Sequence, residues 1–164
     1  MAIRNACKSS RNAGFTLVEL MIVVVIGSIL LTIAIPAYTS QIRKSRRSEA
    51  RTAVLDLAAR EERFLSTANL YTDVPANLGY PASAAPMANV LIGSGYYNLS
   101  VTLQAALPGP PPVPAGYTNT ATATDTQLDD TSCGSISVDQ KGQQTATDSS
   151  NSTSATINST CWGN

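Results

Sequence analysis

The sequence predicts an α+β protein in which a long N-terminal α-helix precedes a small antiparallel β-sheet. Three observations support this fold class: an apolar stretch near the N-terminus, helical spacing that continues beyond it, and short alternating strands in the C-terminal part. The chain has 164 residues, which limits it to one modest domain plus an appendage. We expect a basic leader (1–14), a long helix (15–66) and a globular head (67–164).

Composition excludes several classes of function. Without histidine there is no His-containing hydrolase triad, no His zinc site and no imidazole base. The 11 basic and 11 acidic side chains balance, but unevenly: residues 1–14 carry +3, residues 43–63 carry +3, and the chain from residue 64 onward carries −5. Nucleic-acid binding depends on a surplus of Lys and Arg, so DNA or RNA is not expected as a partner.

The apolar stretch covers residues 15–37 and contains one charged side chain, Glu19. As a helix it would be roughly 35 Å long, which is enough to cross a hydrocarbon core of about 30 Å. A cleaved secretory signal is the alternative, but its apolar region spans only about 7–15 residues and ends at a small-residue cleavage site. The stretch therefore predicts a retained membrane-spanning helix.

Glu19 and Pro36 stand out within this stretch. A carboxylate in a spanning helix costs about 2.5–3.5 kcal/mol on insertion scales, so it normally lies near the headgroups or pairs with a cation. No Lys or Arg lies within residues 15–37, so in an assembly the partner charge must come from elsewhere. Pro36 removes one backbone donor, and the helix can therefore bend or loosen there.

Residues 14–20 (GFTLVEL) resemble the signature of type IV pilins, because they follow a short basic leader and open a long apolar helix. The resemblance implies that a prepilin peptidase cuts after Gly14 and that the new amino group of Phe15 is methylated. It also implies that Glu19, the fifth mature residue, neutralises the N-terminal amine of a neighbouring subunit in a filament. That amine would supply the charge that is missing from the apolar stretch.

Further residues resemble the E-type minor pilins of Gram-negative bacteria. These are RSEA at 47–50, ERF at 62–64, Tyr71, LGY at 78–80 and the closing pair Cys161-Trp162. Type II secretion pseudopilins share the N-terminal motif and remain the alternative. The family implies assembly with other pilin subunits, as a homopolymer or heteropolymer, through a pilus assembly platform in the inner membrane.

Helical spacing continues past Pro36, so the rear half of the helix should pack on the head. The expected buried face consists of apolar side chains at i, i+3 and i+4 steps: Ala50, Val54, Leu57, Ala58, Phe64 and Leu65. Charged side chains are expected elsewhere on the helix: Arg47, Arg51, Asp56, Arg60 and Arg63. We also expect surface pairs of Glu49 with Arg46 and of Asp56 with Arg60. The basic cluster 43–51 is interpreted as a membrane-surface anchor.

Two signals disagree about the side of the membrane on which the head lies. Five basic residues follow the span against three in the leader, which favours a cytoplasmic head. Cys133 and Cys161 remain after removal of the leader with Cys7, and both lie in a polar region with little capacity for a core. They predict a disulfide, which persists outside the cytosol; two reduced cysteines are the alternative. We follow the cysteines and expect a periplasmic head, displayed at the cell surface after assembly.

Strand signals in the head are short. They fall at residues 97–103, at the Thr-rich residues 117–124, and at Ile136 and Val138 before a turn at 139–142. A weaker strand is predicted at Ala155 and Ile157. We expect three or four antiparallel strands, with loops at 70–89 and in the Pro-rich segment 108–114.

A structural pilus subunit accounts for most of these features, with a contribution to filament assembly, twitching motility, adhesion or DNA uptake. A DNA-binding or ligand-binding pilin is the alternative. Its stacking residues would be Tyr96, Tyr97, Tyr117 and Trp162, but core packing explains these aromatics more simply.

Nothing in the sequence indicates an enzyme, since no nucleophile has a visible base. Asp125, Asp129 and Asp130 lack EF-hand spacing and are interpreted as solvated loop acids. We therefore expect no metal and no cofactor.

Overall fold

The computed structural model describes residues 14–81, 86–106 and 115–163. Its contacts divide the chain into two compact units, residues 1–40 and residues 41–164. One helix begins in the first unit and ends in the second. Residues 1–13 of the predicted leader, which include Cys7, and the Pro-rich segment 108–114 lie outside the described residues.

Helix α1 (Leu17–Ala68) has 52 residues, the predicted length, and begins two residues later than predicted. Thr16 precedes it as the N-cap, because the Thr16 hydroxyl oxygen accepts a hydrogen bond of 3.2 Å from the backbone N–H of Glu19. Asn69 follows its last residue with φ at 55°, and the Asn69 N–H donates to the carbonyl of Leu65 at 2.8 Å. This left-handed residue ends the helix.

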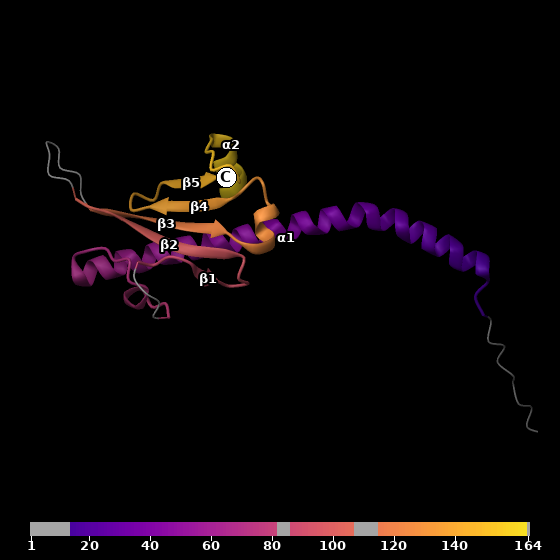
Figure 1. Cartoon of the computed structure of the whole chain (residues 1–164), viewed down its shortest axis with the longest axis horizontal. Coiled ribbons are helices and arrows are strands. Elements are labelled where there is room, and N and C mark those ends of the chain that lie inside the picture. Colours follow the sequence, from indigo (N-terminus) through magenta and orange to yellow (C-terminus); the bar gives the residue numbers. More distant parts are fainter. Residues whose placement is uncertain (1–13, 82–85, 107–114, 164) are drawn as a thin grey trace, which may run out of the picture. The chain divides into compact units, whose positions relative to one another are not determined.

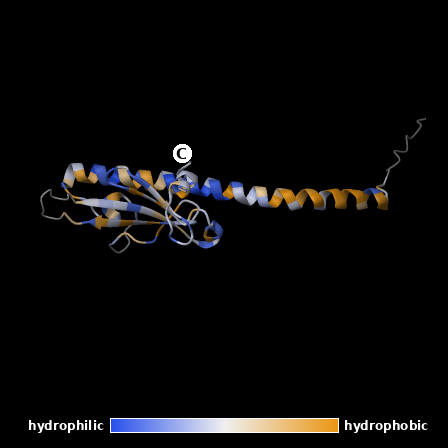
Figure 2. Cartoon of the chain, turned by 90° about the horizontal axis from the view of Figure 1, so that it is seen from above, coloured by the Kyte–Doolittle hydropathy of each residue, from blue (hydrophilic) through white to orange (hydrophobic). Residues whose placement is uncertain are grey.

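In the first unit, most residues of α1 are apolar (Figure 2). Its few hydroxyl side chains are satisfied within the helix, since Ser28 donates to the carbonyl of Val25 and Thr32 to that of Ile29, each at 2.7 Å. Pro36 lies inside the helix, and because it has no N–H it cannot complete the usual bond to the carbonyl of Thr32.

The second unit contains a five-stranded antiparallel sheet whose strands lie in chain order (Figure 1). The strands are β1 (Val90–Ile92), β2 (Tyr97–Gln104), β3 (Gly116–Ala123), β4 (Ser135–Asp139) and β5 (Gln144–Thr147). Strands β2, β3 and β4 match the three strongest predicted strands. The edge strands β1 and β5 were not predicted, so the expected three or four strands were too few.

The core lies between one face of the sheet and the rear part of α1. Helix residues Ala50, Val54 and Leu57 are buried there, as predicted. They pack on side chains that alternate along the strands: Tyr97, Leu99, Val101, Tyr117, Ala121, Ile136, Val138 and Ala146. Strand alternation leaves Ser and Thr side chains on the opposite face.

The predicted strand at Ala155 and Ile157 is wrong, because these residues begin helix α2 (Ala155–Trp162). The Ser154 hydroxyl caps α2 by accepting from the N–H of Ile157 at 3.2 Å, and Gly163 at φ 79° ends it. Two 3-10 helices, η1 (Pro75–Leu78) and η2 (Asp125–Asp129), complete the described elements.

Candidate functional site

The predicted processing site lies in front of the helix. Gly14, Phe15 and Thr16 are exposed and precede the first helical residue, and Phe15 is 82% exposed. A side chain added at Gly14 would meet nothing within 4 Å. The backbone at the predicted cleavage point therefore lies outside helix and strand and is sterically open among the described residues.

Glu19 lies in the first turn of α1, where a negative charge interacts favourably with the helix dipole. Its side chain is exposed, and none of the ion pairs found in the described part of the chain includes it. Glu19 is thus available to a positive charge from outside its own chain, as the resemblance implies.

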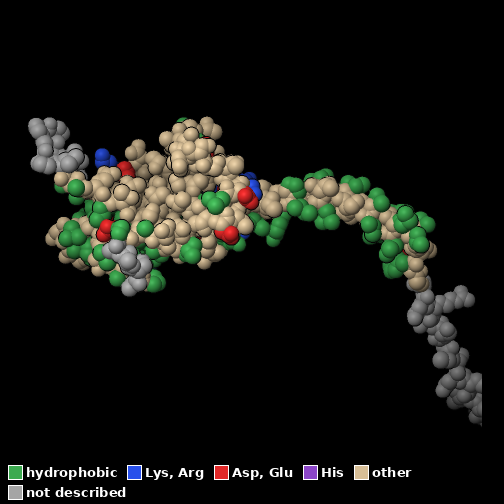
Figure 3. Space-filling view, viewed as in Figure 1, with side chains coloured by type: hydrophobic (Ala, Val, Ile, Leu, Met, Phe, Trp, Pro, Cys, Tyr) green, Lys and Arg blue, Asp and Glu red, His purple; other side chains and the backbone are tan. Residues whose placement is uncertain are grey.

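Among the described residues, α1 is the one helix long and apolar enough to cross a membrane, judged by length and composition. The described residues bury no part of the apolar window responsible for this. Large hydrophobic side chains are exposed along it (Figure 3): Phe15, Leu17, Val18, Leu20, Met21, Ile22, Val23, Val24, Val25, Ile26, Ile29, Leu30, Leu31, Ile33 and Ile35. This surface requires lipid or other helices to cover it.

Most side chains of the basic cluster 43–51 contact the head, contrary to the interpretation of this cluster as a membrane-surface anchor. The Arg46 guanidinium lies 3.3 Å from the centre of the Tyr96 ring, and Arg51 donates to the carbonyl of Cys161 at 2.5 Å. The expected Arg46–Glu49 pair does not form. Instead Glu49 accepts from the backbone and hydroxyl of Ser94, at 2.8 and 3.0 Å.

Arg47 is the residue whose prediction fails most clearly, because it lies on the buried face of α1. Its guanidinium donates twice to the carboxylate of Asp130, at 2.6 and 2.5 Å. Asp130 is only 3% exposed, so it is not a solvated loop acid as predicted. The expected Asp56–Arg60 pair does form, at 2.7 Å.

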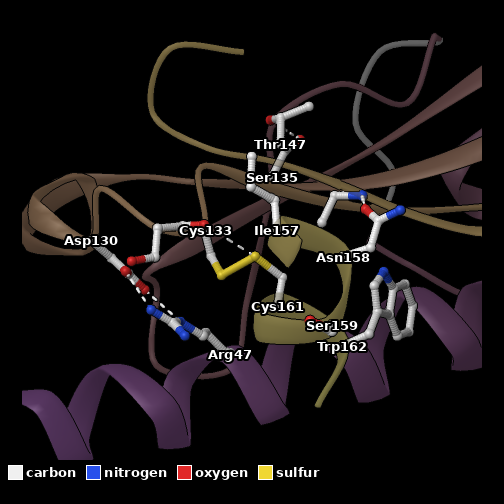
Figure 4. The surroundings of a disulfide bond; sticks show 12 residues. Arg47, Asp130, Cys133, Ser135, Thr147, Ile157, Asn158, Ser159, Cys161 and Trp162 are labelled. Carbon is white, nitrogen blue, oxygen red and sulfur yellow. Dashed lines mark hydrogen bonds and ion pairs between the residues drawn. A yellow bond between two sulfur atoms is a disulfide. The ribbon is translucent and has the colours of Figure 1, made fainter. Parts of the chain in front are cut away.

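The predicted disulfide between Cys133 and Cys161 is present, with 5.7 Å between the two Cα atoms. It joins the segment before β4 to helix α2, and both cysteines are fully buried (Figure 4). Loop closure of this length is worth about 3.6 kcal/mol in the chain-entropy estimate. The bond therefore attaches the C-terminal helix to the sheet.

Helix α2 also covers the free edge of β5. The side-chain oxygen of Asn158 accepts from the N–H of Ala146 at 2.7 Å, and the Trp162 indole N–H donates to the carbonyl of Thr145 at 3.0 Å. These contacts satisfy backbone groups that an edge strand would otherwise present to another chain. Sequence reasoning missed them, although the Ser154 and Gly163 caps were visible signals of a helix.

The aromatic residues considered for base stacking belong to the core. Tyr97, Tyr117 and Trp162 are buried, and Tyr96 packs against the core beneath Arg46. Burial raises the pKa of Tyr97 to about 12. In the described residues, no group of three or more Cys, Asp or Glu side chains is placed to hold a metal ion.

Comparison with known proteins places the chain in a family. Residues 36–137 match the family described as "Type IV minor pilin ComP, DNA uptake sequence receptor", and residues 9–35 match the prokaryotic N-terminal methylation motif.

Two individual relatives are pilins or fimbrial proteins. The chain is 35% identical over 100 residues to the type IV major pilin protein PilA of Myxococcus xanthus (strain DK1622), an alignment that covers 61% of this chain and 46% of PilA. It is 38% identical over 93 residues to the fimbrial protein EcpC of Eikenella corrodens, covering 57% of this chain and 55% of EcpC. Each alignment thus spans about half of the relative.

The family match covers the end of the apolar stretch, the rear part of α1 and the sheet as far as β4. The methylation motif directly precedes it and contains Gly14, Phe15 and Glu19. Because the family match extends over more than half of the sequence, the chain belongs to the type IV minor pilin ComP family.

Proposed function

We propose that the chain is a structural subunit of a type IV pilus, held in the membrane by the front part of α1 before assembly. One observation carries this proposal: the methylation motif opens a helix whose large apolar side chains are not covered by any of the described residues. In a filament these side chains would exchange lipid for the equivalent helices of other subunits. A secretion pseudopilus shares the N-terminal motif, but the family match and both relatives favour a pilus.

Processing would create the charge that Glu19 requires. A prepilin peptidase would cleave after Gly14 and leave a methylated amine on Phe15. Glu19 would pair with the amine of a neighbouring subunit, because an unpaired carboxylate among apolar helices is costly. Apolar burial would thus drive association, and this ion pair would set the register between subunits under the action of the assembly platform.

We further infer that the subunit inserts in the inner membrane with its head in the periplasm. The disulfide supports this side, since such bonds form and persist outside the cytosol. Most of the basic residues that follow the span make contacts within the head, so folding of the head accounts for their presence without reference to topology.

A receptor for DNA is the second candidate, because the matching family is described by that activity. Electrostatics argue against it: residues 41–164 carry eight basic and ten acidic side chains, and five of the basic ones contact the head itself. Lys44, Arg63 and Lys141 remain exposed. A gel shift of duplex DNA at low salt, lost in the Arg63→Ala and Lys141→Ala double variant, would favour the receptor; absence of a shift would exclude it.

The proposed function is tested by the intact mass of the protein from its native membrane or sheared filament fraction. We expect a chain that begins at Phe15, heavier by one methyl group and lighter by two hydrogens for the disulfide. Gly14→Val is the matched control, because its side chain enters open space and would block processing without affecting the fold. An unprocessed wild-type chain with free thiols would contradict the proposal.

A further inference from the structure

Glu61 is a carboxylate in the middle of the packed face of α1. It is 0% exposed and continues the buried row formed by Ala50, Val54 and Leu57 at helical spacing. One of its oxygens accepts a single hydrogen bond, of 3.2 Å, from the backbone N–H of Thr72. Its other oxygen has no hydrogen-bond partner among the described residues.

Among the described residues, no cation is placed to compensate this carboxylate. The ion pairs in the described part of the chain engage Arg43, Arg47 and Arg60 with aspartates. The charged groups that act on Glu61 are Glu62 beside it on α1 and Asp73 on the segment that follows the helix, and both are acidic.

Two tyrosine hydroxyls lie near Glu61 but donate their hydrogen bonds to Glu62. Tyr71, after the helix, and Tyr117, on β3, donate to Glu62 at 3.2 and 3.3 Å. Ionised Glu61 would therefore be buried among acids with one hydrogen bond. Burial raises the pKa of Glu61 to about 7; the hydrogen bond from the Thr72 N–H opposes this rise, and repulsion from the two acids adds to it.

Thr72, the one hydrogen-bond partner of Glu61 among the described residues, lies in the connection between α1 and the sheet. Thr72 is buried, and its hydroxyl oxygen accepts from the N–H of Val74 at 3.1 Å and from the amide of Asn77 at 3.2 Å. The neighbouring carbonyl of Asp73 accepts from the N–H of Met87 at 2.6 Å. The Glu61–Thr72 bond thus fastens residues 71–78, including η1, to the helix.

We propose that Glu61 is a proton-operated latch, which holds residues 71–78 on α1 when protonated and loosens them when ionised. Opening lets water reach both carboxylate oxygens, and the proton passes to solvent. Closing takes a proton back from solvent. The loosened segment would expose backbone on the surface of the head without unfolding the sheet, because Thr72 and η1 lie outside every strand.

Hydrogen exchange measured on the full chain in detergent micelles tests the latch. The readout is the protection factor of a peptide that contains Thr72, corrected for intrinsic exchange, between pH 5 and pH 8. We expect protection to fall by one to two orders of magnitude in the wild type. A pKa raised from 4.5 to about 7 sets an upper limit of about 300-fold.

Two variants identify the residue responsible. In Glu61→Gln, which keeps an acceptor for the Thr72 N–H, corrected protection should not change with pH. In Glu62→Gln, which keeps Glu61 but removes a neighbouring charge, protection should still fall with pH, by a smaller factor than in the wild type. Equal falls in the wild type and Glu61→Gln would overturn the proposal, as would pH-independent protection in the wild type.

A second measurement needs no variant. The carboxyl ¹³C shift of Glu61 in the folded wild-type chain should titrate with a midpoint near 7. A midpoint near 4.5 would overturn the proposal even if Glu61→Gln did not fold.

Discussion

Arg47 and Asp130 form a bidentate ion pair that joins α1 to the end of η2, across 83 positions of sequence. Both side chains are buried, at 8% and 3% exposure. The Gln127 amide donates to Asp130 at 2.9 Å and to the hydroxyl of Tyr97 at 3.2 Å, so the network reaches β2. The Cys133–Cys161 disulfide follows three residues later. The helix, the sheet and α2 are thus tied together where α1 enters the head.

Replacing Asp130 by Asn should destabilise the head by about 3 kcal/mol. The substitution leaves the Arg47 charge buried without a counter-charge, and a broken buried pair costs about 3–5 kcal/mol. The measurement is urea unfolding followed by the fluorescence of Trp162, the one tryptophan of the chain.

Asp129→Asn is the matched control for this prediction. Asp129 is exposed and lies 3.8 Å from Arg43, and exposed pairs of this kind contribute about 0–1 kcal/mol. If Asp130→Asn cost no more than Asp129→Asn, the buried pair would not be the attachment described above.

Stability of the head should fall as the pH rises from about 4.5 to 7. In that range the unfolded chain has Glu61 ionised while the native state keeps it protonated. The native state therefore binds more protons, and the free energy of unfolding decreases with pH. A difference of about 2.5 pKa units corresponds to roughly 3 kcal/mol. Urea unfolding at pH 5 and pH 8 measures it.

Glu61→Gln should remove most of this dependence and leave the variant more stable than the wild type at pH 8. Glu62→Gln should keep most of the wild-type slope, since burial of Glu61, the main cause of its raised pKa, is unchanged. A wild type with equal stability at pH 5 and pH 8 would show that Glu61 is solvated in the folded chain.

Reduction of the Cys133–Cys161 bond should cost about 2–4 kcal/mol and release α2 first. The bond closes a loop of about 29 residues. Apart from the bond, the contacts that hold α2 include those of Asn158 and Trp162 with β5 and that of the Cys161 carbonyl with Arg51. The fluorescence of Trp162 should shift to the red on reduction. The Cys133→Ser and Cys161→Ser double variant should have the stability of the reduced protein, and adding reductant should not change it. If neither reduction nor the double substitution lowered the unfolding midpoint, the prediction would be contradicted.

The parts of the fold that sequence predicted are those with strong local patterns. The apolar run, the alternation in β2 and the turn after β4 are each clear enough to be recognised in a single sequence. Strand β1 has three residues and β5 has Ala146 as its only apolar residue, so neither carries a readable alternation. Ala155 and Ile157 alternate by chance within a helix that is determined by its caps and by the disulfide.

The candidate site divides in the same way. Gly14, Phe15 and Glu19 belong to one short motif, so the sequence alone predicts a processing and pairing site there. The buried positions of Arg47 and Glu61 were missed because charged side chains were assigned to the solvent side. Their spacing from Ala50 and Leu57 follows the i+3 and i+4 steps of the apolar row, and that was the available signal. Nothing local indicates that Asp130 and Thr72 are their partners.

Glu19→Val should leave membrane insertion intact and impair incorporation into filaments. Valine costs less free energy than glutamate to insert into lipid, so the membrane fraction should contain as much of the variant as of the wild type. The amount of the variant in the filament fraction should be at least about tenfold lower than that of the wild type, because the Phe15 amine of a neighbouring subunit would be buried unpaired. A tenfold loss corresponds to about 1.4 kcal/mol per subunit. Quantitative immunoblots of the membrane and sheared filament fractions measure both. Glu19→Asp keeps the charge and should recover part of the incorporation, whereas normal filaments from Glu19→Val would exclude charge pairing as the source of register.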